Sequence, residues 1–404
     1  MIRRPVVQRI VLALMLTALQ IALTMAVASR RPPQNRSRWH ASLGRDSPLY
    51  DKLCAEDCQW YQWIAEHGYI TEFPIRTVDP RYSDVAFFPG FPLWVRVVHA
   101  ATNVSWLRAT LLASQMAAFG FWCWFLALLD YWKMPLRIAL FAVLALLVHP
   151  ASFYLVAGYS ESVMMFALAA LLWCVENDSR LSGAFGALAT ATRLPSVALG
   201  AYPVLRSFSP RRCRAACWAA AILMPVGALA FFFYCQIRFS AWDLYMQTQR
   251  FGWGQFPDYL FFLRRTTYLP ELPFRKTVLL TMAVFVVAAV AEIAVRSQPP
   301  PANSGIDEED RSRIRLALWL AALASFYITA AGCANAGKFH SGFIDFIRYT
   351  PPMGFLIVFM AADQWRRANA PRATQWIAAI VVMAGSLVSL RLALREAVTH
   401  FAQR

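Results

Sequence analysis

The sequence predicts an all-α polytopic membrane protein with about nine to eleven transmembrane helices and a large first outer loop. Of its 404 residues, 58% are hydrophobic and 15% are charged, whereas a soluble domain has roughly 45–50% apolar and about 25% charged residues. The net charge is nevertheless +16. This much apolar sequence excludes a soluble globule, and an aromatic content of 14% excludes a disordered chain. The high apolar fraction also argues against a nucleic-acid partner as the reason for the positive net charge.

The first predicted element is a transmembrane helix in residues 1–28, because an apolar run from 11 to 28 follows Arg3, Arg4 and Arg9. The small residues Ala26-Val27-Ala28 also fit a signal-peptide cleavage site. The many later apolar runs favour an uncleaved helix. Residues 29–104 then form the first outer loop, whose nine cations and eight acids nearly balance.

Residues 105–396 are predicted to form a multi-span membrane domain. Residues 297–312, with three successive prolines and four successive acids, read as a cytoplasmic linker within it. The expected spans are the apolar runs 105–130, 137–158, 160–176, 215–237, 277–295, 316–332, 346–362 and 374–390.

The run 182–205 is ambiguous, because Arg193 and Pro195 interrupt it. Arginine-rich loops are expected on the cytoplasmic side. We assume a cytoplasmic N-terminus. The cluster Arg211, Arg212 and Arg214 then reaches the cytoplasmic side only if residues 182–205 do not cross the membrane. They would instead enter it and return as a hairpin broken at 192–195. The alternative is a single crossing, which leaves this cluster or the later ones outside.

A short helix in the outer loop carries the first candidate catalytic group. Residues 55–67 precede the helix breaker Gly68, and Asp57, Trp60, Tyr61 and Ile64 share one face. A carboxylate on an otherwise apolar stripe suits a general base. It also fits a plain helix N-terminal acid that the helix dipole favours.

A second motif begins at Asp84 and continues as Phe87-Phe88-Pro89-Gly90-Phe91-Pro92. Together, Asp-x-x-Trp-Tyr-x-x-Ile-Ala-x-x-Gly-Tyr and Phe-Phe-Pro-x-x-Pro resemble the PIG-V-type mannosyltransferases. This family, in the GT-C superfamily, adds the second mannose to GPI precursors and has bacterial relatives. Weaker matches follow in order at 158–162, 191–195 and 348–352. One departure is Glu56 where relatives usually have Trp before the aspartate.

The resemblance implies a GT-C-type helix bundle that transfers a sugar, with mannose expected, from a polyprenyl-phosphate donor to a glycan or glycolipid acceptor. Asp57 would accept the proton of the attacking hydroxyl, in one displacement with inversion. The donor phosphate needs cations, and Arg348 is the best candidate, with Lys338 and His340 close in sequence. Arg193 is a second phosphate candidate; stabilising the hairpin is an equally good role for it.

Four further residues have two interpretations each. Asp84 either binds acceptor hydroxyls or solvates a loop, and Glu161 is a weaker candidate for the same binding role. Trp60 and Tyr61 either stack on a sugar ring or anchor the chain at the membrane interface. The segment 250–255 is either a cover over the cavity or, more simply, an interfacial loop.

No metal site, cofactor or nucleotide-binding glycine loop is predicted from the sequence. Cys54 and Cys58 are spaced for a disulfide in an oxidising compartment, although a helix through both would make the geometry awkward.

The competing functional class is a transporter or flippase of lipid-linked saccharides. Transporters keep ionisable residues near the bilayer midplane, whereas here the acids and aromatics concentrate in an outer loop. An inactive homologue that serves as an assembly partner is a third option. The expected location is a bacterial plasma membrane with the site on the outer face, or the lumenal side of the endoplasmic reticulum in a eukaryote.

Overall fold

The protein is an all-α polytopic membrane protein. The computed structural model describes residues 6–29, 53–54, 57–69, 84–209, 214–252, 254–268, 273–296, 308–336 and 346–367. Within these ranges, five helices are long and apolar enough to cross a membrane: 6–26, 106–131, 214–239, 275–293 and 310–334. Many large apolar side chains on α13 (Pro273–Arg296) face outward, as expected for a lipid-facing helix.

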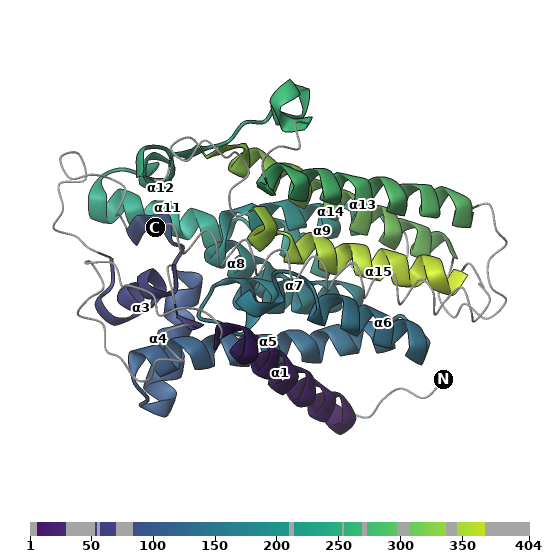
Figure 1. The fold of residues 1–404 in the computed structure, drawn as a ribbon, viewed down its shortest axis with the longest axis horizontal. Helices are drawn as coiled ribbons and strands as arrows, with labels where there is room; N and C mark the ends of the chain where they lie inside the picture. The colour runs from purple at the N-terminus through teal and green to yellow at the C-terminus, as the bar shows by residue number, and fades with distance from the viewer. Residues whose placement is uncertain are drawn as a thin grey trace.

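The described helices run in one elongated bundle (Figure 1). The remaining α-helices are α1 (Val6–Ala28), α3 (Asp57–His67), α4 (Gly90–Thr102), α5 (Trp106–Tyr131), α6 (Leu136–Leu147), α7 (Glu161–Glu176), α8 (Ser182–Thr192), α9 (Ala201–Arg206), α10 (Arg214–Leu223), α11 (Val226–Phe239), α12 (Leu244–Gln247), α14 (Glu308–Ala334) and α15 (Pro351–Arg367). Shorter helical turns are η3 (Asp84–Ala86), η4 (Ser152–Leu155), η5 (Leu194–Gly200), η6 (Thr248–Gly252), η7 (Phe261–Leu263), η8 (Arg265–Tyr268) and η9 (Phe346–Tyr349).

The helices α5 and α7 form the centre of the bundle. The helix α1 packs on α5, α8 packs on α7, and α14 packs on both α15 and α9. A buried Gln20–Trp122 hydrogen bond of 3.0 Å joins α1 to α5. The only regular strand pairing in the described residues is one antiparallel bridge between β1 (Gln255–Phe256) and β2 (Asn335–Ala336).

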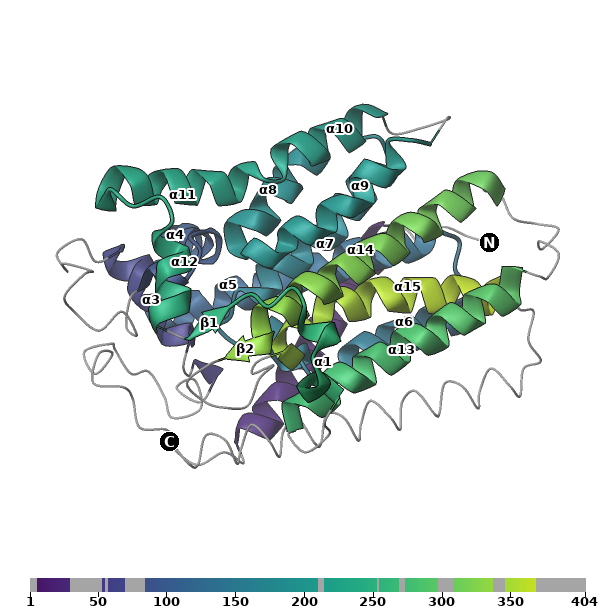
Figure 2. The same cartoon turned by 90° about the horizontal axis from the view of Figure 1, so that it is seen from above.

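The bundle has two distinct ends (Figure 2). We call the end that holds α3 and η9 the α3 end, and the end where α5, α7, α13 and α15 finish the opposite end. The short helix α3 lies against α4 and α5. It stops at Gly68, which has a φ of +79°, and the Arg96 guanidinium caps its last turn by donating to the Ala65 carbonyl at 2.6 Å.

The structure confirms the predicted hairpin in 182–205. The helix α8 starts at the opposite end, where the Ser182 hydroxyl donates to the Ala216 carbonyl at 2.6 Å. The helical path breaks at Arg193, which has extended backbone angles, just before Pro195. The chain then returns through η5 and α9 to the opposite end, where Arg206 pairs with Glu176.

A buried ionic network holds the returning arm of this hairpin at the opposite end. The Arg206 guanidinium donates to Glu176 Oε1 at 2.8 Å and to Asp310 Oδ1 at 2.8 Å. The hydroxyl of Tyr202 donates to the same Glu176 oxygen at 2.6 Å. Because a buried carboxylate needs paired donors, this network fixes α7, α9 and α14 relative to one another.

Three predicted segments differ from the observed helices or fall outside the described residues. The expected span 137–158 is a shorter helix, α6, followed by the turn η4. The linker expected at 297–312 is already helical from Glu308, since acidic residues favour a helix N-terminus. The predicted last span, 374–390, lies outside the described residues.

Candidate functional site

The first component of the site is Asp57, at the N-terminus of α3. Its side chain is 22% exposed, whereas Trp60, Tyr61 and Ile64 on the same face are buried. The predicted stripe therefore packs into the protein and leaves the carboxylate at its edge. The helix dipole favours a negative charge at this position.

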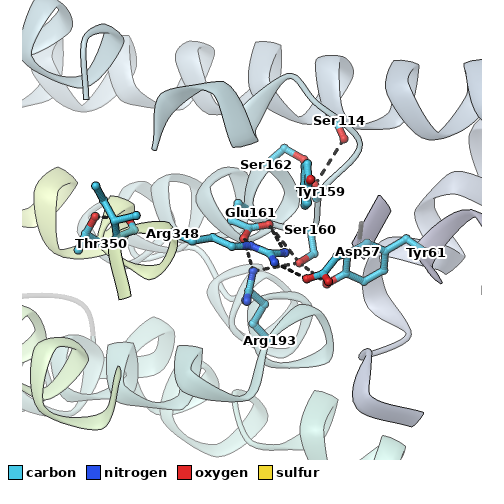
Figure 3. Close-up of polar contacts among 11 residues, drawn as sticks. Asp57, Tyr61, Ser114, Tyr159, Ser160, Glu161, Ser162, Arg193, Arg348 and Thr350 are labelled. Atoms are coloured by element: carbon cyan, nitrogen blue, oxygen red, sulfur yellow. Dashed lines mark hydrogen bonds and ion pairs between the residues drawn. The ribbon is translucent and has the colours of Figure 1, made fainter. Parts of the chain in front are cut away.

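Arg348, in the turn η9, connects Asp57 to a second carboxylate (Figure 3). Its Nη1 donates to Asp57 Oδ2, and its Nε donates to Glu161 Oε1. A longer contact of 3.4 Å joins its Nη2 to Glu161 Oε2. The planar guanidinium thus joins two acids, Asp57 and Glu161, that are 104 residues apart in sequence.

Glu161, the first residue of α7, is completely buried and is paired with two arginines. The second is Arg193, which the hairpin carries to its tip. The Arg193 Nη1 pairs with Glu161 Oε1 and donates to the Ser160 hydroxyl at 3.4 Å. A buried carboxylate left without such partners would be strongly destabilising.

Tyrosine rings surround the two guanidinium groups. The Arg348 group lies 4.9 Å from the ring centroid of Tyr159 and 5.3 Å from that of Tyr154. The Arg193 group lies 4.2 Å from the ring centroid of Tyr349. These rings keep water from the arginines while still stabilising their charge.

Tyr61 joins α3 to the turn before Glu161 from the other side. Its hydroxyl and the Ser160 hydroxyl share a hydrogen bond of 2.8 Å. Its ring meets Phe87 and Phe91 edge-on. Burial raises the pKa of Tyr61, so this group stays a neutral phenol at physiological pH.

A disulfide between Cys54 and Cys58 links the start of α3 to the chain just before it, with a Cα–Cα distance of 5.0 Å. The helical geometry expected to disfavour it does not apply, since the helix begins at Asp57 and Cys54 precedes it. The disulfide packs directly on Gly158, where an added Cβ would lie 2.1 Å from the Cys58 Sγ. The turn 158–161 therefore fits against the disulfide only with a glycine at this position.

The other predicted site residues lie elsewhere or cannot be placed. Asp84 is buried in η3 and interacts electrostatically with Tyr69, and its role in binding acceptor hydroxyls stays a prediction. Trp60 is buried with its ring stacked on Phe87 at 5.8 Å, and sugar contact by Trp60 or Tyr61 stays a prediction. Lys338 and His340 lie outside the described residues.

The structure adds four groups that sequence reasoning did not assign to the site: Ser160, Tyr159, Tyr349 and Tyr154. Ser160 and Tyr349 directly adjoin the predicted residues Glu161 and Arg348, and Tyr159 lies two residues before Glu161, so proximity in sequence was the available signal for these three. In the described part of the chain, no group of three or more His, Cys, Asp or Glu side chains could hold a metal ion.

The arrangement provides two cations and two carboxylates, so its formal charge is zero. Glu161 is fully enclosed and structural, whereas Asp57 is the more accessible acid. A ligand that brings a negative charge to Arg348 would compete with Asp57 for it. The geometry thus couples binding of an anion to the ion pair of a partly exposed carboxylate.

The chain is similar to a mannosyltransferase. It is 32% identical to GPI alpha-1,6-mannosyltransferase 2 of Mus musculus over 195 aligned residues, which cover 44% of this chain and 35% of that protein. The chain thus spans about a third of the length of the curated relative that it matches. No protein-family model matches the sequence.

Proposed function

We propose that this protein is a membrane glycosyltransferase of the GT-C type that transfers a sugar, with mannose expected, from a polyprenyl-phosphate donor to a lipid-linked or surface glycan acceptor. The observation that carries the proposal is the Asp57–Arg348–Glu161–Arg193 cluster, in which one carboxylate is accessible and two arginines are held in place. The similarity to a mannosyltransferase supports the same class of reaction.

In the proposed reaction, an acceptor hydroxyl attacks the anomeric carbon of the donor sugar. The new bond forms as the bond between that carbon and the phosphate oxygen breaks, and the electron pair leaves with the phosphate. Asp57 accepts the hydroxyl proton, which its position at the edge of the cluster allows. Attack opposite the phosphate inverts the anomeric configuration.

Arg348 is the group best placed to stabilise the leaving phosphate, because it already contacts the proposed base. A phosphate that binds Arg348 competes with Asp57 for the guanidinium, which leaves the carboxylate oxygen free to contact the acceptor hydroxyl. Arg193 and Glu161 hold Arg348 in position and keep the local charge balanced. A lipid-linked donor explains why such a site belongs to a membrane protein.

The distribution of positive charge supports an outer-face location of the site in this proposal. The start of α10, the start of α14 and the end of α15 carry Arg214, Arg311, Arg313, Arg315 and Arg366. They lie at the opposite end of the bundle, and such arginine-rich segments favour the cytoplasm. The α3 end then faces the periplasm or the lumen, where a disulfide such as Cys54–Cys58 persists.

The test is an in vitro transfer assay with the purified full chain in lipid. Polyprenyl-phosphate mannose, polyprenyl-phosphate glucose and GDP-mannose are offered separately, each with a panel of glycolipid acceptors. We expect transfer from polyprenyl-phosphate mannose alone. Transfer from GDP-mannose would contradict the lipid-linked donor, and movement of intact lipid-linked sugar across vesicles without transfer would favour a flippase.

Variants then test the base. Asp57→Asn keeps the shape of the side chain and removes its charge, so we expect transfer to fall by about 10²- to 10⁴-fold. The matched control is Asp243→Asn, which changes an acid whose described contact is only with Gln247. Full activity of Asp57→Asn at normal membrane levels would exclude the proposed base.

A further inference from the structure

A second charged cluster lies at the opposite end of the bundle, far from Asp57. It surrounds a small cavity between the end of α5, the first turns of α14 and the last turn of α15. Three arginines line this cavity, Arg311 and Arg315 from α14 and Arg366 from α15, together with the carboxylate of Asp363 and the indole of Trp132. None of these residues takes part in the proposed transfer.

Several N–H donors that line this cavity have no acceptor. Among the described residues, Arg311 Nη1, Arg366 Nε and Trp132 Nε1 are buried and have no hydrogen-bond partner. Arg311 is 4% exposed and Trp132 is 6% exposed, so water at the protein surface does not satisfy them. Buried donors normally have partners, because an unpaired one loses the hydrogen bonds it makes to water in the unfolded chain.

The carboxylates present are already used by other groups. Asp363 accepts from Arg366 Nη2 at 2.7 Å and from Arg315 Nη1 at 3.2 Å, and it lies 3.9 Å from Arg311 Nε. Glu292 pairs with Arg315 at 3.1 Å. Among the described residues, three guanidinium groups therefore face two carboxylates, which gives this part of the structure one positive charge in excess.

Unsatisfied donors together with a positive charge select an anion over a neutral guest. The cavity volume is about 20 Å³, which admits one oxygen-sized atom but not a whole phosphate group. An oxyanion that stands at the mouth and inserts one oxygen fits both observations. Because membrane-spanning helices end here, the phosphate of a lipid headgroup and free phosphate both have access.

We propose that this cavity is an anion-binding site that holds one oxygen of a phosphate group, with Arg311, Arg366 and Trp132 as its donors. Bound phosphate connects α5, α14 and α15 at the end of the bundle remote from the transfer site. The proposal is independent of the function proposed above, since it rests on other residues and is tested by binding and stability alone.

The experiment measures thermal unfolding of the purified full chain in a neutral detergent at constant ionic strength. The titrants are inorganic phosphate, phosphatidylglycerol added to the micelles, and sodium chloride. The variants are Arg311→Gln and Trp132→Phe, and the matched control is Arg137→Gln, which removes an exposed arginine from α6 close to the same end. Trp132→Phe keeps one aromatic ring and removes the pyrrole ring with its N–H. It therefore tests the site even if Arg311→Gln fails to fold.

We expect phosphate or phosphatidylglycerol to raise the unfolding temperature of the wild type more than chloride does. The apparent affinity should fall about tenfold in Arg311→Gln, which loses a charge-assisted hydrogen bond, and a few-fold in Trp132→Phe. Arg137→Gln should behave as the wild type. A response to the lipid alone assigns the site to a headgroup, and a response to free phosphate alone assigns it to the soluble ion.

Two results would overturn the proposal. If neither phosphate source stabilises the wild type beyond chloride, the cavity holds water or a halide. If Arg137→Gln weakens binding as much as Arg311→Gln or Trp132→Phe does, the effect is a general attraction of the positive surface rather than a site.

Discussion

Replacing Gly158 with alanine tests whether the contact between the disulfide and the turn 158–161 sets the catalytic geometry. The added Cβ would lie 2.1 Å from the Cys58 Sγ, whereas ordinary van der Waals contact begins near 3.4 Å. The new Cβ and the Cys58 Sγ must therefore move 1.3 Å farther apart, which is the difference between 3.4 and 2.1 Å. The disulfide is tied to the first turn of α3, so the separation moves Asp57 and the turn that holds Glu161 apart.

That displacement bears directly on activity, because Arg348 contacts both carboxylates at once. A misplacement of about 1 Å near reacting groups costs about 10²-fold in rate. Overpacking of this kind also lowers the free energy of unfolding by about 1–3 kcal/mol. We therefore expect Gly158→Ala to fold, to unfold at a lower temperature and to lose about 10²-fold in transfer rate.

The assay compares initial transfer rates and unfolding temperatures with those of Gly332→Ala. Gly332 lies within α14, and a Cβ there would meet no atom within 4 Å. Replacing a helical glycine with alanine adds roughly 0.5–1 kcal/mol to the free energy of unfolding. A Gly158→Ala protein with the transfer rate of Gly332→Ala would refute the reasoning.

A double substitution separates the disulfide contact from other effects of Gly158→Ala. In a Cys54→Ala, Cys58→Ala background the Sγ atoms are gone, and the nearest remaining atom to the new Cβ is a Thr110 methyl at 3.1 Å. We expect Gly158→Ala to cost much less activity in that background. Equal losses in both backgrounds would show that the disulfide does not transmit the displacement.

Three further substitutions test the cluster. Glu161→Gln leaves two buried arginines with one fewer acid, so the free energy of unfolding should fall by about 3–5 kcal/mol; an unchanged denaturation midpoint would contradict this. Arg348→Lys keeps the charge but cannot contact both carboxylates in the same way, and we expect transfer to fall on the order of 10²-fold with normal membrane levels. Tyr61→Phe removes the hydrogen bond to Ser160, so stability should fall by about 1 kcal/mol while transfer persists, and loss of transfer would show that the hydroxyl acts in the reaction.

Local sequence signals predicted the elements that carry the site. Gly68 ends α3 as expected, and the face shared by Asp57 and the aromatic residues is buried except for the carboxylate. The break at Arg193 was also predictable, because Pro195, two residues later, cannot continue a helix through this apolar run. Each of these signals acts within a few residues.

Properties that depend on tertiary packing were not predictable. The hairpin carries Arg193 at its tip as far as Glu161, and the packing of α8 on α7 sets that depth. The sequence likewise ranked Glu161 as a weak candidate, because its burial between two arginines comes from contacts with residues 193 and 348. The Cys54–Cys58 disulfide was expected to be awkward because a helix was assumed to run through both cysteines. The helix starts only at Asp57, so Cys54 lies before it.

The hairpin also bears on which end of the bundle the later described helices reach. Since α8, η5 and α9 enter and leave at the same end, they do not carry the chain from one end of the bundle to the other. In this arrangement η9 lies at the α3 end, where Arg348 contacts Asp57 and Glu161. If residues 182–205 were straightened into one full crossing, the later helices would run in the reverse direction, and Arg348 would lie at the end away from its carboxylates. The pairing of Arg206 with Glu176 thus has a consequence beyond local packing, because it holds the returning arm of the hairpin at the end of the bundle where that hairpin starts.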